Sequence, residues 1–284
     1  PEEEDEVTTI YLADRGTETV YYADDSGLCK WNGRNSGLDA ITDIAVADEA
    51  TIYALDFDGN DEGVAKSTQH ARRWDSPEHS GVDEGHTIVC VGENVLVSGT
   101  DGKVGYSDDG GASFSELDDI GNGEVHVAFD SYFADNDYVY AAVAGADRGI
   151  YRSTIADASF DSMEACDFDY YGILISYPDG NPKTTADTGG VLYAAYAEAE
   201  VTDFPDSGVA RCLDPASDLC CGNLSWDYLY AKLGDDVEFN TQPSDLDLCG
   251  CLTSGTDTTL WAIDKARYYV DWDWVADEFD DSAA

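Results

Sequence analysis

A dense run of hard oxygen ligands lies in one short segment between two apolar runs. The residues concerned are Asp56, Asp58, Asn60, Asp61 and Glu62. Carboxylate and amide oxygens at this density suit a cation with six to eight oxygen ligands, such as Ca²⁺. The segment is not an EF-hand, because its sixth position is Asp61 rather than Gly. We predict a Ca²⁺ site here; the alternative is a hairpin turn whose geometry Asp and Asn simply favour.

Cysteines supply the second possible chemistry. None of the eight has a partner at C-x-x-C spacing, which excludes zinc knuckles, thioredoxin-like centres and c-type haem attachment. Five of them cluster late in the chain: Cys212, Cys220, Cys221, Cys249 and Cys251. This cluster predicts disulfides in an oxidising, extracellular compartment, with the pairing left open. The sequon at Asn223 lies beside it and is a glycosylation candidate.

Catalytic motifs are missing from the sequence. There is no G-x-S-x-G, no phosphate-binding loop and no H-E-x-x-H. His70 and His79 share one stretch with Asp75 and Glu78, which favours a solvated loop over a transition-metal site. We therefore expect no catalytic residues, no haem and no nucleotide, and we predict that the chain is not an enzyme.

The net charge of the chain limits the kinds of partner that it can bind. The chain has 284 residues, with 60 acidic and 14 basic side chains and a formal net charge of −46. Phosphates are repelled by such a surface, which excludes nucleic acid and anionic membranes as partners. No apolar stretch approaches the length of a membrane span, and residues 1–7 do not resemble a signal peptide. An acidic coat of this size requires salt or bound cations to limit self-repulsion.

The composition nevertheless indicates a folded β-rich protein. Hydrophobic residues make up 43% of the chain and aromatic residues 12%, which is too many for disorder. A Tyr-rich apolar run, a turn and a second run that opens on Gly recur along the chain. The first runs begin at Val20, Ile52, Val95, Val139, Val191 and Leu260, and the second runs begin at Gly27, Gly63, Gly102, Gly149 and Gly208. Four further strands are predicted to precede copies, at 41–46, 87–91, 125–129 and 173–177. The spacing is typical of propeller blades.

One turn of this repeat carries a sharper motif. Ser107, Asp109, Gly111 and Phe114 match S-x-D-x-G-x-x-[F/W]. The ends of the motif recur at the same offset, from Ser67 to Trp74 and from Ser153 to Phe160. We expect Asp to accept backbone N–H bonds in a tight turn, Gly to supply an unusual backbone angle, and the aromatic ring to fill the space between blades.

This motif resembles the Asp-box of sialidase-like and sortilin-like β-propellers. The wider pattern VYAA…GIYRS is similar to prokaryotic surface-layer proteins and to propellers of the photosystem-assembly-factor type. The resemblance implies that the box residues are structural and lie away from the functional face. A sialidase-like activity would also require three convergent arginines, which nothing in the sequence places together.

These observations predict an all-β protein, a β-propeller with about six visible blades. Seven blades and a β-sandwich of hairpins are the alternatives. Residues 1–284 form one domain, with a Cys-rich, loop-like insertion at about 203–256. We expect an extracellular structural subunit of a cell-surface assembly, which binds copies of itself and Ca²⁺. The alternatives are a propeller module that binds glycans or proteins, and a glycosidase.

Overall fold

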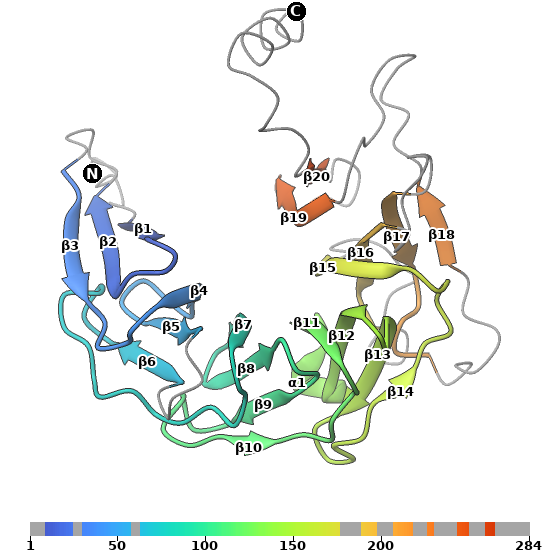
Figure 1. The fold of residues 1–284 in the computed structure, drawn as a ribbon, viewed down its shortest axis with the longest axis horizontal. Helices are drawn as coiled ribbons and strands as arrows, with labels where there is room; N and C mark the ends of the chain where they lie inside the picture. The colour runs from blue at the N-terminus through green and yellow to red at the C-terminus, as the bar shows by residue number, and fades with distance from the viewer. Residues whose placement is uncertain are drawn as a thin grey trace, which may run out of the picture.

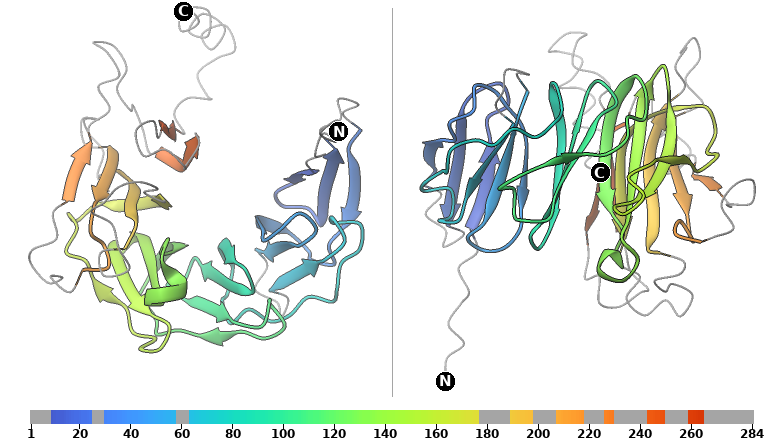
Figure 2. Two further views of the ribbon diagram at one scale, coloured as in Figure 1. Left: turned by 180° about the vertical axis from the view of Figure 1, so that it is seen from behind. Right: turned by 90° about the horizontal axis from the view of Figure 1, so that it is seen from below.

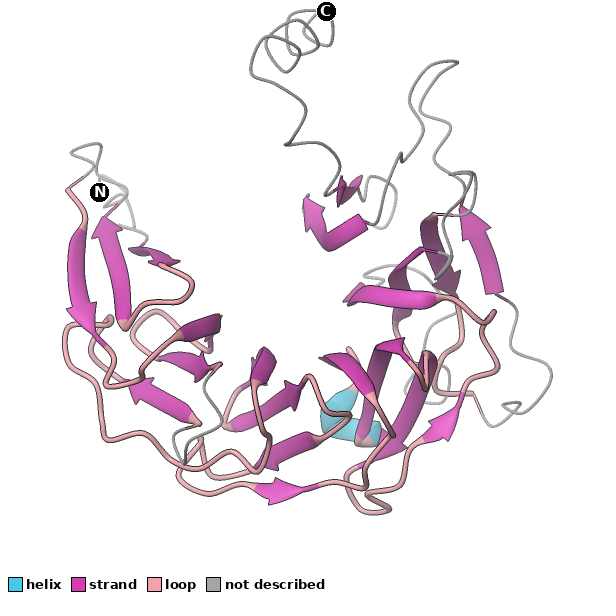
Figure 3. Ribbon diagram, viewed as in Figure 1, coloured by secondary structure: helices cyan, strands magenta, loops and turns pink. Residues whose placement is uncertain are grey.

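The structure is a computed structural model, and it describes residues 9–24, 30–57, 63–176, 189–197, 207–217, 226–229, 243–249 and 259–264. Almost all regular structure in this part of the chain is β-strand (Figure 3). The strands form six antiparallel sheets, which we number 1 to 6 in chain order. The predicted all-β class is therefore confirmed.

Each sheet is built from strands that follow one another in sequence. Sheet 1 contains β1 (Thr9–Ala13), β2 (Thr19–Asp24) and β3 (Asn32–Asn35). Sheet 2 contains β4 (Ile41–Val46), β5 (Ile52–Asp56) and β6 (Val64–Ser67). Sheet 3 contains β7 (Gly85–Val91), β8 (Asn94–Gly99), β9 (Val104–Ser107) and β10 (Ser115–Glu116).

The later sheets repeat this order. Sheet 4 contains β11 (Gly123–Phe129), β12 (Tyr138–Gly145), β13 (Gly149–Thr154) and β14 (Asp161–Ser162), and the single helical turn α1 (Phe133–Asn136) lies between β11 and β12. Sheet 5 contains β15 (Asp169–Ser176), β16 (Val191–Ala197), β17 (Gly208–Cys212) and β18 (Trp226–Leu229). Sheet 6 contains β19 (Pro243–Cys249) and β20 (Thr259–Asp264).

The sheets follow one another along an arc (Figure 1). The first strands of sheets 2 to 5 lie on its concave side, and the later strands of each sheet lie toward the outside. The strands run across the arc from one of its faces to the other (Figure 2). This radial order is that of a propeller; the number of blades in the whole molecule stays a prediction.

Apolar side chains fill the spaces between neighbouring sheets. β12 alternates: Val139, Ala141 and Val143 pack toward sheet 3, whereas Tyr140 and Ala142 pack toward sheet 5. In β5, Ile52 and Ala54 face sheet 1, and Tyr53 and Leu55 face sheet 3. Both faces of these second strands are therefore covered, which explains why they appear in the sequence as unbroken apolar runs.

The strand register defines two faces of the arc. In sheet 3, β7 begins opposite the end of β8, where Gly85 pairs with Gly99. The other end carries the β7–β8 turn and the end of β9, where Ser107 pairs with Val95. We call the face where first strands begin the upper face, and the opposite one the lower face.

The third strand of sheet 1 was not predicted. It is β3, which pairs with β2 from Asn32 to Asn35, whereas most of the run predicted from Gly27 to Trp31 lies outside the described residues. Polar Asn residues at both ends of β3 hid it from a search for apolar runs. The two-residue strands β10 and β14 supply the fourth strands that were expected from connecting stretches.

Candidate functional site

A pocket of about 630 Å³ opens on the upper face between sheets 3, 4 and 5, and we call it the upper pocket. Its lining residues are Thr100, Gly123, Glu124, Ala144, Gly145, Asp169 and Tyr171. They lie at the end of sheet 3, at the start of β11, at the end of β12 and at the start of β15. The pocket is therefore built from three consecutive repeats.

A β-bulge positions the aromatic side chain of this pocket. The register between β15 and β16 shifts between Tyr170 and Gly172, so that Tyr171 is the extra residue. Tyr170 is fully buried between sheets 4 and 5, whereas Tyr171 is half-buried at the pocket. A bulge turns a side chain away from the regular alternation of a strand, which explains how both tyrosines find a place.

Asp169 is held firmly at the base of the upper pocket. Its carboxylate accepts a hydrogen bond from the Gly145 N–H at 2.8 Å. Arg148 forms ion pairs with Asp169 at 3.8 Å and with Asp167 at 3.1 Å. The buried Asp169 thus joins sheet 5 to the β12–β13 turn of sheet 4, and its charge is partly compensated by the guanidinium.

Glu124 and the hydroxyl oxygen of Tyr171 remain available to accept hydrogen bonds from a ligand, while the Tyr171 hydroxyl donates to Asp169. Glu124 is exposed near the start of β11. Burial, followed by the negative charges of Asp169 and Glu124, raises the pKa of Tyr171 to about 12. At neutral pH the phenol is therefore uncharged. The pocket presents carboxylate acceptors and one phenol, which suits a ligand rich in N–H or O–H donors.

Two histidines lie on the concave wall close to the upper pocket. His86 on β7 and His126 on β11 approach each other with 3.2 Å between their Nε2 atoms. His126 lies two residues beyond Glu124, so both side chains project from the same side of β11. The Thr87 hydroxyl lies 3.3 Å from Nδ1 of His126.

A second bulge places His86. The register between β7 and β8 shifts between Gly85 and Thr87, which makes His86 the extra residue. Both bulges lie near the start of a first strand, in the second residue of β7 and in the third residue of β15. Among the four histidines, the sequence pattern draws attention to His70 and His79 and does not reveal the pair of His86 and His126. Equal spacing in the repeat does not reveal it, because β11 has no bulge and its histidine is the fourth residue.

The turn from Ser107 to Phe114 lies on the lower face. Asp109 accepts hydrogen bonds from the Ser107 and Ser113 hydroxyls and from the N–H groups of Ala112 and Ser113, at 2.7–2.9 Å. These bonds, led by that of the Ser113 hydroxyl, lower the pKa of Asp109 to about 2. Gly111 has a φ of +80° and donates its N–H to Ser107 Oγ.

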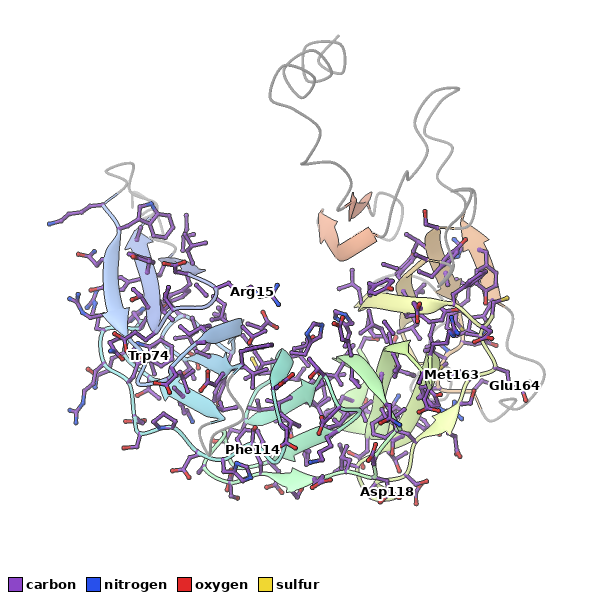
Figure 4. All side chains as sticks on the ribbon, viewed as in Figure 1. Arg15, Trp74, Phe114, Asp118, Met163 and Glu164 are labelled. Carbon is purple, nitrogen blue, oxygen red and sulfur yellow. The ribbon has the colours of Figure 1, made fainter. Side chains whose placement is uncertain are left out.

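Three aromatic residues close the equivalent turns of sheets 2, 3 and 4. Each packs against the apolar cluster between its own sheet and the preceding one: Trp74 between sheets 1 and 2, Phe114 between sheets 2 and 3, and Phe160 between sheets 3 and 4. Trp74 and Phe114 are labelled in Figure 4. The serines at the start of these turns, Ser67, Ser107 and Ser153, are buried.

The turns differ in detail where the motif is incomplete. His70 and Ala71 have φ values of 54° and 56°, at the positions of Gly110 and Gly111. In sheet 4 the Thr154 hydroxyl bonds to Asp157 at 2.8 Å, and the left-handed residue is Ala158. The aromatic ring thus keeps its place although the turn that carries it changes.

Of the predicted Ca²⁺ ligands, only Asp56 is described. It is buried at the end of β5, and its Oδ1 accepts the Ala40 N–H at 3.0 Å. Asp58, Asn60, Asp61 and Glu62 lie outside the described residues. Among the residues that the structure does describe, no three His, Cys, Asp or Glu side chains are arranged to hold a metal ion. The Ca²⁺ site stays a prediction.

Cys90, Cys166 and Cys212 form no disulfide in the part of the chain whose side chains the structure describes. Cys90 and Cys166 are thiols, and burial raises the pKa of Cys90 to about 11. Cys212 is buried at the end of β17, and its thiol lies 3.7 Å from the Asp214 carboxylate. Cys249 ends β19, whereas Cys220, Cys221, Cys251 and Asn223 lie outside the described residues. Most of the predicted insertion at about 203–256 lies outside them too.

The described chain contains no helix with the length and hydrophobicity that a membrane crossing requires.

No protein-family model and no curated protein matches this chain. Solved structures do match. The GH74 enzyme of Niastella koreensis is 19% identical, with a TM-score of 0.52 over 75% of this chain and 28% of that one. Hydrazine synthase of Kuenenia stuttgartiensis is 12% identical, with a TM-score of 0.55 over 84% and 67%. YCF48 bound to D1 peptide is 12% identical, with a TM-score of 0.54 over 92% and 79%.

These similarities confirm the β-propeller fold. They also correct the prediction that the chain is not an enzyme, because an enzyme shares this fold. Missing motifs did not justify the exclusion, since a propeller presents side chains from several repeats that no short motif joins. The chain spans 28% of the length of the GH74 enzyme, and identities this low show the fold alone.

Proposed function

We propose that this chain is an extracellular binding module whose upper pocket holds a polypeptide segment carrying a basic side chain. The observation that carries this proposal is the exposed Glu124 carboxylate beside Asp169 and Tyr171 in a pocket of about 630 Å³. The volume is adequate for one Lys or Arg side chain and part of its backbone.

The chemistry of the pocket favours a cationic ligand. Glu124 can accept from an ammonium or guanidinium group, and the neutral phenol of Tyr171 supplies a second acceptor beside it. Arg148 already pairs with Asp169, so the carboxylate that is left for a ligand is that of Glu124. The net charge of −46 also steers cations toward the surface and repels acidic competitors.

One neighbour supports a peptide over a sugar. The YCF48 structure contains a D1 peptide, so this fold holds a peptide in at least one protein. A glycan remains the alternative, because sugar hydroxyls also donate to carboxylates. The first experiment therefore compares the two ligand classes directly.

We expect the tripeptide acetyl-Gly-Lys-Gly-amide to bind with a measurable affinity, and Glu124→Gln to weaken it about tenfold, since a hydrogen bond to a charged group contributes about 1.5–3 kcal/mol. Titrations followed by amide NMR should shift the Gly123 and Gly145 signals. The same peptide with norleucine in place of lysine, and the disaccharide cellobiose, are the comparison ligands.

Asp118→Asn is the matched control, because it removes one carboxylate from an exposed site on the outside of the arc (Figure 4). It should leave the affinity unchanged. Equal binding of lysine and norleucine peptides, or equal loss in the Asp118 variant, would contradict the proposal. Stronger binding of cellobiose would replace it with the glycan alternative.

A second candidate is the cell-surface assembly predicted from sequence. In β1, Tyr11 and Ala13 pack toward sheet 2, whereas Ile10 and Leu12 point away and are 47% and 54% exposed. Tyr21 pairs with Leu12 and lies on the same side of the sheet. This apolar side of sheet 1 supports association between copies, with Ca²⁺ or salt screening the acidic coat.

Sedimentation velocity tests this second candidate. We expect the protein to associate as its concentration rises in millimolar Ca²⁺, and the double variant Ile10→Lys, Leu12→Lys to stay monomeric. Val46→Lys is the control, because Val46 is 51% exposed on β4. A wild-type protein that is monomeric at every concentration would eliminate the assembly.

A further inference from the structure

His86 and His126 form a pair whose geometry goes beyond ordinary packing. They belong to the first strands of sheets 3 and 4, which lie side by side on the concave wall. The rings meet edge to face with 4.6 Å between centroids, and their Nε2 atoms share a hydrogen bond at 3.2 Å, in which one ring donates and the other accepts. Both side chains are half-buried, so each keeps some solvent-exposed surface.

The separation of the two nitrogens matches that of metal ligands. Nitrogens about 2.0–2.1 Å from an ion lie about 2.9 Å apart in square-planar geometry and about 3.4 Å apart in tetrahedral geometry. The observed 3.2 Å falls between these limits. Metal binding would replace this hydrogen bond: the donating ring shifts its proton from Nε2 to Nδ1, and a small movement of either ring then directs both Nε2 lone pairs at one ion.

Thr87 can fix the tautomer that such a site requires. An imidazole that binds a metal through Nε2 carries its proton on Nδ1 and donates it to a neighbouring oxygen. The Thr87 hydroxyl is 3.3 Å from Nδ1 of His126, which is the position of such an acceptor. The same bulge that turns His86 toward sheet 4 also brings Thr87 beside His126.

We propose that His86 and His126 bind one divalent transition-metal ion through their Nε2 atoms, with water completing the coordination. Two imidazoles select Cu²⁺, Zn²⁺ or Ni²⁺ and discriminate against Ca²⁺ and Mg²⁺, which prefer oxygen ligands. The acidic surface raises the local cation concentration. This site is separate from the peptide proposed for the upper pocket and does not depend on it.

Calorimetric titration of the full chain with Zn²⁺, in millimolar Ca²⁺ to occupy surface carboxylates, tests the site. We expect saturation at one ion per chain. Thr87→Val should weaken binding about tenfold, and His86→Gln or His126→Gln by about a hundredfold or more. His70→Gln and His79→Gln are matched controls, because these are the only other histidines of the sequence, and both variants should bind like the wild type.

A measurement on the unaltered protein covers the case of a variant that does not fold. Substoichiometric Cu²⁺ should broaden the imidazole NMR signals of His86 and His126 first, and leave those of His70 and His79 sharp. The absence of saturable Zn²⁺ binding, equal loss in the control variants, or equal broadening of all four histidines would each overturn the proposal.

Discussion

Replacing Asp130 with alanine is expected to lower the free energy of unfolding by about 3–5 kcal/mol. Asp130 follows β11, is 2% exposed and accepts four hydrogen bonds. The donors are the Tyr132 N–H, the Asn136 side-chain amide, the Tyr140 hydroxyl and the Gly190 N–H, at 2.8, 3.0, 2.8 and 3.2 Å. Alanine would leave buried donors from two sheets without an acceptor.

Smaller changes to Asp130 and its hydrogen-bond partners should lower the free energy of unfolding by smaller amounts. Tyr140→Phe removes one donor and leaves the carboxylate with three, which should cost about 1 kcal/mol. Asp130→Asn should have an effect between those of Asp130→Ala and Tyr140→Phe. Its NH₂ group replaces one carboxylate oxygen and cannot accept hydrogen bonds from Gly190 and Tyr140. Asp135→Ala removes the same charge from an exposed site on α1 and should change stability by less than about 0.5 kcal/mol. Urea denaturation followed by tryptophan fluorescence gives these values. The role assigned to Asp130 is wrong if its alanine variant is no less stable than Tyr140→Phe.

Gly102→Ala is expected to destabilise the protein by at least about 4 kcal/mol, or to prevent folding. Gly102 lies in the β8–β9 turn with a φ of +89°, and an added Cβ would clash with the Gly121 carbonyl oxygen. The Gly102 carbonyl also accepts the Ile120 N–H at 3.1 Å, so this turn is clamped to the connection that leads into β11. Neither backbone segment can move without breaking that bond.

Comparison with Gly92→Ala separates the effect of the steric clash with Gly121 from the effect of the left-handed backbone conformation. Gly92 lies in the β7–β8 turn with a φ of +61°, and its added Cβ would meet nothing within 4 Å. This variant should lose only about 1 kcal/mol, from the left-handed backbone. Thermal unfolding of both variants by circular dichroism compares them. Similar losses in the two would mean that strain alone matters and that the contact with Gly121 relaxes freely.

The sequence predicted the middle of each sheet better than its edges. β5, β8, β12 and β16 are covered on both faces, so their apolar runs could be recognised without knowing the neighbours. β1, β18 and β19 were not predicted. β1 alternates between half-buried and exposed residues, and β19 carries two aspartates among its seven residues. Their strand character depends on pairing with partners that lie later or earlier in the chain.

The candidate site could not be predicted from the sequence, for a related reason. Glu124, Asp169 and Tyr171 come from two repeats, and only the packing of sheet 4 against sheet 5 brings them together. His86 and Tyr171 also depend on bulges, which shift the side-chain alternation by one residue. Gly85 and Gly172 adjoin these bulges, but in a chain with 27 glycines their presence does not mark a bulge. The box turn was predictable because the side-chain hydrogen bonds of Ser107 and Asp109 lie within the eight residues from Ser107 to Phe114.

The placement of Trp74, Phe114 and Phe160 has a consequence for how such a chain can evolve. Each ring belongs to one repeat but seals the interface with the repeat before it. A repeat that is duplicated or deleted by recombination therefore carries its own aromatic ring with it. Each remaining interface between such repeats still receives one ring. The three turns have diverged in their other residues. This is expected when selection acts on the aromatic ring and the other residues of the loop are free to change. Repeat number can thus change in whole steps without a compensating mutation in the neighbours.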